Sequence, residues 1–189
     1  MARKAAPRQT PEDKLIDAAL ALAAETPWAR VGMAEIADAA KVDLAVAYDA
    51  FPCRASLIAA VIRRHDKAML TGDDPSLAEE SKRDRLFEAI MRRLEAMRPH
   101  KAALKSMACG AAADPGVLLL AGPAMLNSAK WMLRAAGVRA EGLSGAIRAK
   151  AVLAAYAAAV RAFFKDDSED LSSTMAALDK ALKRVGGAI

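Results

Sequence analysis

The sequence predicts an all-α protein with one principal core. Apolar residues make up 54% of the 189-residue chain. Alanine is abundant among them, β-branched runs are few, and glycine and proline are spaced at intervals that would separate helices. A chain of this length can bury one sizeable core but not two large domains. We therefore expect a helical body with a smaller helical unit packed on it.

The N-terminal part predicts four helices. Thr10-Pro11-Glu12-Asp13 is typical of a helix start, because it offers a hydroxyl cap, a proline at the first helical position and carboxylates near the positive end of the helix dipole. Apolar residues then recur at helical spacing to about Glu25. Further helices are predicted at residues 33–40, 43–50 and 54–70. The expected units are a head at residues 9–51, with a helix-turn-helix at about 32–51, and a bridging helix at residues 52–72.

The C-terminal part, residues 73–189, predicts a larger helical body. The stretch from Thr71 to Pro75 combines a glycine and a proline with turn-forming residues and reads as a linker. Helices are predicted at residues 82–97, 99–113, 115–136, 143–165 and 168–185. Pro123 lies inside an otherwise helical run and predicts a kink that opens space. The last helix carries one apolar stripe: Leu171, Met175, Leu178, Leu182 and Val185.

Several classes of function have little support in the sequence. No uninterrupted apolar run approaches the roughly 18 residues of a membrane span, so we expect a cytoplasmic protein. His65 and His100 lack a catalytic partner at a recognisable spacing and are expected to be surface or capping groups. The acidic stretch at residues 166–170 is expected to cap a helix rather than to bind calcium. The prediction is a protein that is not an enzyme and has no metal site, disulfide or cofactor.

The distribution of charge is informative about nucleic-acid binding. The chain has a net charge of +5, but residues 9–65 contain eight acidic and six basic side chains. Only the preceding tail, with Arg3, Lys4 and Arg8, makes this end of the protein basic. The tail is therefore expected to supply phosphate or groove contacts if the head meets DNA.

The N-terminal pattern resembles the TetR family of regulators. The resemblance covers about residues 14–62 and is carried by LIDAALALAAE, by a proline-tryptophan turn and by MAEIADAAKVDLAVAYDAFPCRASL. It implies a three-helix DNA-binding head, joined through a fourth helix to a ligand-binding body that dimerises through its last two helices. The residues expected to meet DNA are Arg3, Lys4, Arg8, Lys41, Asp43, Leu44, Val46, Tyr48 and Arg54.

The helix expected to read DNA departs from the family pattern. Lys41 stands where the turn favours glycine, and Asp43 can serve as the helix cap. Tyr48 and Phe51 match the pattern, and Arg54 matches a basic residue at the start of the fourth helix. However, residues 44–47 have no hydrogen-bond donors in their side chains, and leucine, alanine and valine can only touch a thymine methyl. This helix is therefore expected to position the protein better than it specifies a sequence.

The C-terminal half loosely resembles a lipid-binding helper family of ubiquinone biosynthesis that shares the TetR fold but does not act through DNA. The segments that carry this resemblance are RPHKAAL, WMLRAAG, IRAKAVLAAY and KDDSEDLSSTMAALDKALKRV. Two functions thus stay open: a regulator whose DNA binding is relieved by an apolar ligand, and a DNA-silent helper that binds a lipid or isoprenoid. A membrane contact of the last helix is the weaker alternative to a dimer contact.

The body has the composition of an apolar ligand pocket. Flexible methionines are common in such pockets, although they also fill ordinary cores. Tyr156 and Asn127 are nearly the only candidates for buried polar groups. The expected ligand contacts are Met97, Met107, Leu119, Met125, Trp131, Tyr156 and Phe163. The expected contacts of a homodimer are Tyr156, Val160, Leu178 and Leu182.

Overall fold

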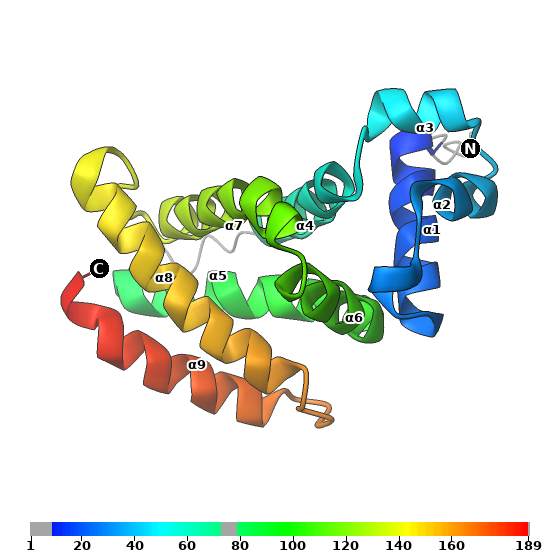
Figure 1. The fold of residues 1–189 in the computed structure, drawn as a ribbon. Helices are drawn as coiled ribbons and strands as arrows, with labels where there is room; N and C mark the ends of the chain where they lie inside the picture. Colours follow the sequence, from blue (N-terminus) through cyan, green and yellow to red (C-terminus); the bar gives the residue numbers. More distant parts are fainter. Residues whose placement is uncertain (1–8, 73–78, 189) are drawn as a thin grey trace, which may run out of the picture.

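The computed structural model describes residues 9–72 and 79–188, and the regular elements within these ranges are all helical (Figure 1). The predicted all-α fold is therefore confirmed. A small unit, made of the first three helices, lies at one end of the molecule. The remaining helices form a larger body, whose apolar core is continuous with that of the small unit.

The head consists of α1 (Pro11–Glu25), α2 (Met33–Ala40) and α3 (Leu44–Ala50), with a short 3-10 turn, η1 (Trp28–Arg30), after α1. The predicted cap at Thr10 is present, because its side chain accepts the Asp13 amide N–H at 3.1 Å. Between α2 and α3 the chain turns at Lys41, whose φ of 54° and ψ of 47° are left-handed. Such a conformation favours glycine, which explains why a lysine is unusual at this position.

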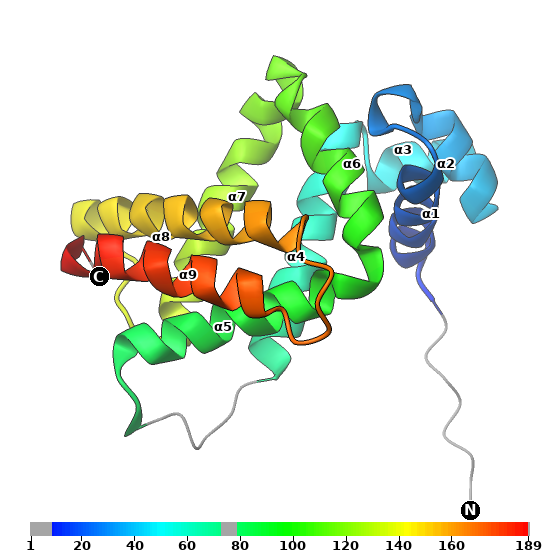
Figure 2. The same ribbon diagram turned by 90° about the horizontal axis from the view of Figure 1, so that it is seen from below.

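The fourth helix connects the head to the body. The elements that follow the head are α4 (Arg54–Thr71), α5 (Lys82–Met97), η3 (Arg98–His100), α6 (Lys101–Ala112), α7 (Pro115–Ala135), α8 (Gly142–Phe163), α9 (Ser172–Val185) and η4 (Gly186–Ala188). The helix α7 continues through Pro123. In Figures 1 and 2, α8 and α9 run side by side and antiparallel on the far side of the body from the head. The helix α6 packs against α1 of the head.

The last helix begins at Ser172, four residues later than expected. The reason is the capping role of Asp166, whose carboxylate accepts the amide and hydroxyl of both Ser168 and Thr174. These bonds, led by the Ser168 hydroxyl, hold the pKa of Asp166 well below its usual range. Leu171 precedes the helix in a left-handed conformation, with φ of 55°. The acidic stretch thus caps α9.

The expected dimer contacts are largely enclosed by their own chain. Leu178 and Leu182 have no exposed surface, and Tyr156 is 3% exposed. The apolar stripe of α9 packs against α8 and α5 of the same body, so these three side chains cannot meet a second copy. The assignment was wrong because an amphipathic stripe shows that a face is buried but not which chain covers it. Val160 is half-buried.

The helix α8 is long and apolar enough to span a membrane by length and composition alone. This departs from the expectation that no such window exists, and the cause is its high alanine content, which raises the mean hydropathy. In the fold, α8 packs between α7 and α9, with a third of that window buried. The cytoplasmic location stays a prediction.

Candidate functional site

The body contains a partly open cavity of about 290 Å³ between α4, α5, α6, α7 and α8. Its wall is mostly aliphatic or sulfur-containing. We call it the body cavity. Each of the five helices contributes to its wall, through side chains that include Ile62, Met97, Met107, Val117, Met125 and Val160. Leu118 lines the cavity and is also half exposed at the surface, which places an opening near the start of α7.

Four of the seven expected ligand contacts line this cavity, namely Met97, Met107, Met125 and Tyr156. The other three lie elsewhere. Leu119 is 77% exposed, Trp131 stacks against the Arg134 guanidinium at the surface, and Phe163 is fully buried without lining the cavity. Phe164 takes the position expected of Phe163, and Val160, expected at a dimer interface, also lines the cavity. A shift of one residue turns a helical side chain by about 100°, which the alanine-rich sequence could not resolve.

A buried polar cluster forms part of the cavity wall. Arg93 on α5 donates from Nε to Asp66 Oδ1 on α4 at 2.9 Å, and Ser128 on α7 donates to the same oxygen at 2.5 Å. The Arg93 Nη1 group donates to the Tyr156 hydroxyl on α8 and to the Met97 sulfur. Arg93 is 2% exposed and Asp66 is 6% exposed. The ion pair joins α4 to α5, and its hydrogen bonds to Ser128 and Tyr156 add α7 and α8, so the cluster connects four of the five helices around the cavity.

Sequence reasoning found only Tyr156 of this cluster. Asn127, the other expected buried polar group, is exposed. Asp66 and Arg93 lie on charged helices and are 27 residues apart, so no local spacing connects them. The available signal was weak: Asp66 follows the inward residues Ile58 and Ile62 at successive four-residue steps, which places a carboxylate on an apolar face.

His65 is buried beside this cluster, which corrects the expectation of a surface or capping group. Its side chain is 4% exposed and lines the cavity. Nδ1 lies 2.8 Å from the Val61 carbonyl, so this nitrogen carries the proton and donates it. Burial lowers the pKa of His65 to about 4, and the ring is therefore neutral near pH 7. Nε2 is then an acceptor.

We predict that Asp66→Ala lowers the free energy of unfolding by about 3–5 kcal/mol, because it leaves the Arg93 charge buried without a partner. The double variant Asp66→Leu with Arg93→Met should recover most of this loss. Urea unfolding measures both effects. Asp17→Ala, which removes a partly exposed partner of Arg64, is the control and should cost less than about 1 kcal/mol. An equally small loss in Asp66→Ala would contradict the role of the pair.

The outward face of α3 is apolar. Leu44, Val46 and Tyr48 are 58%, 40% and 65% exposed. Asp43 occupies the cap position but its side chain makes no cap bond. The exposed charges on α2, α3 and the turn are four carboxylates and one amine: Glu35, Asp38, Asp43, Asp49 and Lys41. This surface offers DNA one cation and the Tyr48 hydroxyl. Arg3, Lys4 and Arg8 lie outside the described residues.

Arg54, expected to contact a phosphate, is engaged inside the protein. Its Nη1 donates to the Trp28 and Val31 carbonyls at 3.1 and 3.2 Å. The guanidinium also lies over the Trp28 ring and 3.8 Å from an Asp114 oxygen. In this arrangement Arg54 fastens the start of α4 to the η1 turn and to α7, so its donors are not directed at DNA.

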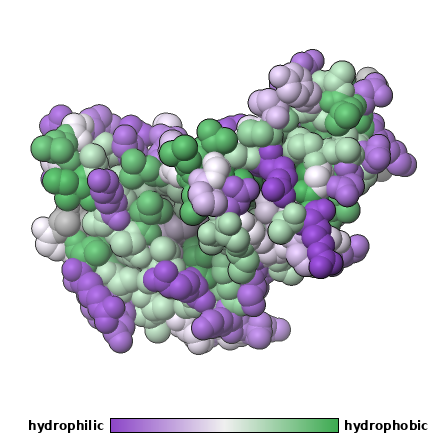
Figure 3. Space-filling view, in the orientation of Figure 1, coloured by the Kyte–Doolittle hydropathy of each residue, from purple (hydrophilic) through white to green (hydrophobic). Residues whose placement is uncertain are grey.

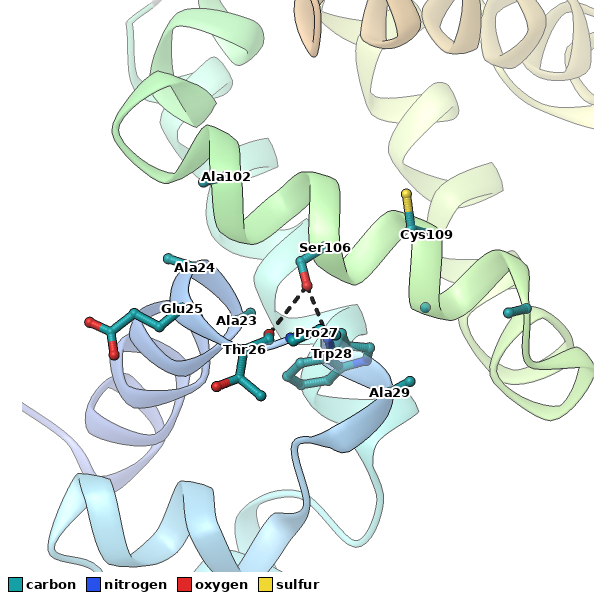
Figure 4. Close-up of a pocket in the computed structure, with 12 residues that line it drawn as sticks. Ala23, Ala24, Glu25, Thr26, Pro27, Trp28, Ala29, Ala102, Ser106 and Cys109 are labelled. Carbon is teal, nitrogen blue, oxygen red and sulfur yellow. Dashed lines mark hydrogen bonds between the residues drawn. The ribbon is translucent and has the colours of Figure 1, made fainter.

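Trp28 fixes the head to the body at α6 (Figure 4). The Trp28 amide donates to Ser106 Oγ at 2.9 Å, and the Ser106 hydroxyl lies 3.4 Å from the Thr26 carbonyl oxygen. The Trp28 ring is buried against Gly110, because a Cβ atom placed there would lie 2.9 Å from the ring. We call this contact the head junction. The sequence pointed to the proline-tryptophan turn but not to its partner on α6.

The helix α6 has the head junction on one side and the body cavity on the other. Ser106 and Gly110 contact the head, while Leu104, Met107, Ala108 and Ala111 line the cavity. The helix α4 likewise holds the head through Arg54 and lines the cavity farther along, with Ile58, Ile62 and His65. A molecule in the cavity would therefore press on the two helices that position the head.

We predict that Gly110→Ala weakens the head junction. The added methyl group would overlap the Trp28 ring, and overpacking of this kind costs about 1–3 kcal/mol. The free energy of unfolding and the fluorescence of Trp28 should both change. Gly186→Ala is the matched control, because a Cβ there meets nothing within 4 Å. Unchanged stability and fluorescence in Gly110→Ala would show that the junction is looser than described.

The arrangement defines a class of protein: a helix-turn-helix head carried on an α-helical body that contains an apolar cavity. Residues 15–61 match the model of the "Bacterial regulatory proteins, tetR family". The head is thus similar to the N-terminal domain of that family, in line with the resemblance seen in the sequence. None of the curated proteins matches the chain in sequence.

Solved structures extend the likeness to the whole fold. A TetR transcriptional regulator from Nitrosomonas europaea has a TM-score of 0.74 at 21% identity, covering 95% of this chain and 99% of that one. A TetR transcriptional regulator from a Rhodococcus species has a TM-score of 0.64 at 22% identity, covering 91% and 95%. At these identities the likeness establishes a TetR fold. The resemblance of the C-terminal half to the quinone-biosynthesis helper family gains no support from these matches and stays a prediction.

Proposed function

We propose that this chain is a transcriptional regulator of the TetR type, which binds DNA as a homodimer and releases it when a small apolar ligand enters the body cavity. The observation that carries this proposal is the shared use of α6, which meets the head at Ser106 on one face and the cavity at Met107 on an adjacent face. The match of the head to a family of DNA-binding regulators supports the DNA partner.

The mechanism follows from this geometry. A ligand that prefers one position of α4 and α6 shifts the population of head orientations, because both helices contact the head. In a two-fold dimer, such a shift changes the spacing of two heads that must meet two half-sites. The coupling is reciprocal, so DNA must weaken ligand binding by the factor by which the ligand weakens DNA binding. A ligand that binds equally well with and without DNA would contradict this mechanism.

DNA binding is tested with promoter DNA from the gene's own neighbourhood, against a random duplex, over a range of salt concentrations. We expect a preference of about 1,000-fold or more for the promoter. Lys41→Ala should weaken binding to both duplexes and reduce the salt dependence by about one counterion, since it removes one phosphate contact. Arg54→Ala should act through the head junction and therefore also lower stability. Weak binding that is equal for both duplexes would contradict the regulator.

A second function is favoured by one observation, the apolar and acid-flanked face of α3. With Leu44, Val46 and Tyr48 outward, the head lacks the donors that read base edges. A DNA-silent protein that holds a lipid or isoprenoid in the body cavity would keep this helix as scaffold. Lipid that co-purifies with the protein in native mass spectrometry, combined with the absence of promoter preference, would select this alternative.

The dimer contact is best supported on the outward face of α8 rather than on the stripe of α9. Leu143 and Ile147 are 81% and 56% exposed, and Ala154 is exposed farther along the same helix. Figure 3 shows apolar surface at the end of the molecule where α8 begins. The exposed side chains of α9 include three cations, Lys180, Lys183 and Arg184, whereas the outward face of α8 begins with the apolar Leu143 and Ile147 and carries two cations, Lys150 and Arg161, farther along. Isologous packing of α8 against its copy would cover the apolar face.

We predict that Leu143→Glu with Ile147→Glu converts the dimer to monomer, because each two-fold contact would then bring carboxylates into an apolar interface. Both side chains are exposed in the single chain, so the stability of the monomer should change by less than about 0.5 kcal/mol per site. Sedimentation velocity measures the association. Lys180→Glu on α9 is the control and should stay dimeric. Dissociation of the control alone would place the interface on α9.

A further inference from the structure

The polar groups of the body cavity restrict the kind of ligand that it can hold, an argument that rests on the proposed ligand function and refines it. Three polar side chains line the otherwise apolar wall: His65, Arg93 and Tyr156. Each is at least nine-tenths buried. Polar groups of this kind in an apolar pocket usually fix the orientation and identity of the ligand.

The charge of the cavity is balanced without a ligand. The Arg93 guanidinium is paired with the Asp66 carboxylate at 2.9 Å, and His65 is neutral because burial lowers its pKa to about 4. A carboxylate or phosphate that entered would add a negative charge beside Asp66 and would have to be desolvated without a counter-ion of its own. An ammonium would meet Arg93 with the same sign of charge. The cavity therefore favours an uncharged molecule.

The hydrogen-bonding groups add a further requirement. His65 uses Nδ1 for the Val61 carbonyl, and its Nε2 has no hydrogen-bond partner among the described residues. In the neutral ring this nitrogen can only accept a hydrogen bond. The Tyr156 hydroxyl already accepts from Arg93, and its own proton is directed to the Met97 sulfur at 3.3 Å, which is a weak acceptor. The Arg93 Nη2 group also has no hydrogen-bond partner among the described residues. The cavity thus offers one unused acceptor, His65 Nε2, and donors from Tyr156 and Arg93.

We infer that the body cavity takes a small, uncharged alcohol or phenol, whose hydroxyl donates to His65 Nε2 and accepts from the Tyr156 hydroxyl. A hydroxyl group supplies both functions from one atom. The apolar remainder of the ligand lies against the side chains of α6 and α7, among them Met107 and Met125. At about 30 Å³ for a water-sized group, the cavity of about 290 Å³ holds roughly ten non-hydrogen atoms.

The test compares three probes on the free protein, without DNA, each with ten non-hydrogen atoms: 4-propylphenol, the isomeric ether 4-ethylanisole, and 4-methylbenzoate. Calorimetry near neutral pH should show that the phenol binds about tenfold more tightly than either of the others. This is the effect expected of the hydrogen bond to His65, which only the phenol can donate. Equal affinity of the phenol and the ether, or tighter binding of the benzoate, would overturn the inference.

Variants connect the preference to the named side chains. His65→Phe should reduce phenol affinity to that of the ether while the ether still binds, which shows that the cavity is intact. Tyr156→Phe, which retains the ring, should remove part of the preference. His100→Phe is the matched control, since His100 faces the His65 ring at 6.4 Å but does not line the cavity. The assignment would be contradicted if His65→Phe kept the full preference for the phenol over the ether. It would also be contradicted if His100→Phe, and not His65→Phe, lost that preference.

The outcome is separable from that of the proposed function. Phenol preference without any effect on promoter binding would uphold the ligand class and contradict the regulator. Promoter binding that is released by the ether or the benzoate as well as by the phenol would uphold the regulator and overturn the ligand class. Failure of all three probes to bind would overturn the ligand class. It would leave the test of the regulator unaffected, because promoter preference is measured without any probe.

Discussion

The buried pair of Asp66 and Arg93 is the constraint on which the body of this protein depends. Two opposite charges in an apolar core are tolerated only when each finds its partner and its hydrogen bonds, so the helices that carry them must hold one geometry. Ser128 and Tyr156 complete those bonds from α7 and α8. The pair thus fixes four helices around a space that apolar packing alone would tend to close. Two members of the cluster, Arg93 and Tyr156, form part of the cavity wall.

The same constraint explains how much could be read from the sequence. Caps, prolines and helical spacing are local, so the helices from residue 11 to 135 lie within two or three residues of their predicted bounds. The buried cluster is not local, because Asp66 meets partners 27 and 62 residues away. The stripe of α9 was recognised as a packing face, but Leu178 and Leu182 are covered by the same chain rather than by a copy. A periodic apolar stripe shows that a helix face is buried, but not whether the same chain or a second copy packs against it.

Arg54 shows why a motif match does not assign a role. Its position follows the family pattern, yet its donors reach the Trp28 and Val31 carbonyls. A guanidinium with two carbonyls, an aromatic face and a nearby carboxylate gains little by exchanging them for one solvated phosphate. The residue therefore holds the head in place. Any DNA contact by the head must then come from groups that the fold leaves exposed, such as Lys41 and Tyr48.

The exposed apolar face of α3 and the partly open, uncharged body cavity together limit how this chain could act as a regulator. The face of α3 offers almost no base-specific donors, so sequence preference would have to arise from phosphate positioning and from the shape of the duplex. Such recognition depends on the relative placement of two heads more than on any single side chain. It is therefore sensitive to small movements of α4 and α6, which both contact the head and line the body cavity. A head with few base contacts would need less coupling energy to lose its DNA preference than one held by many base contacts, so a ligand with a small difference in affinity between the two head orientations could suffice.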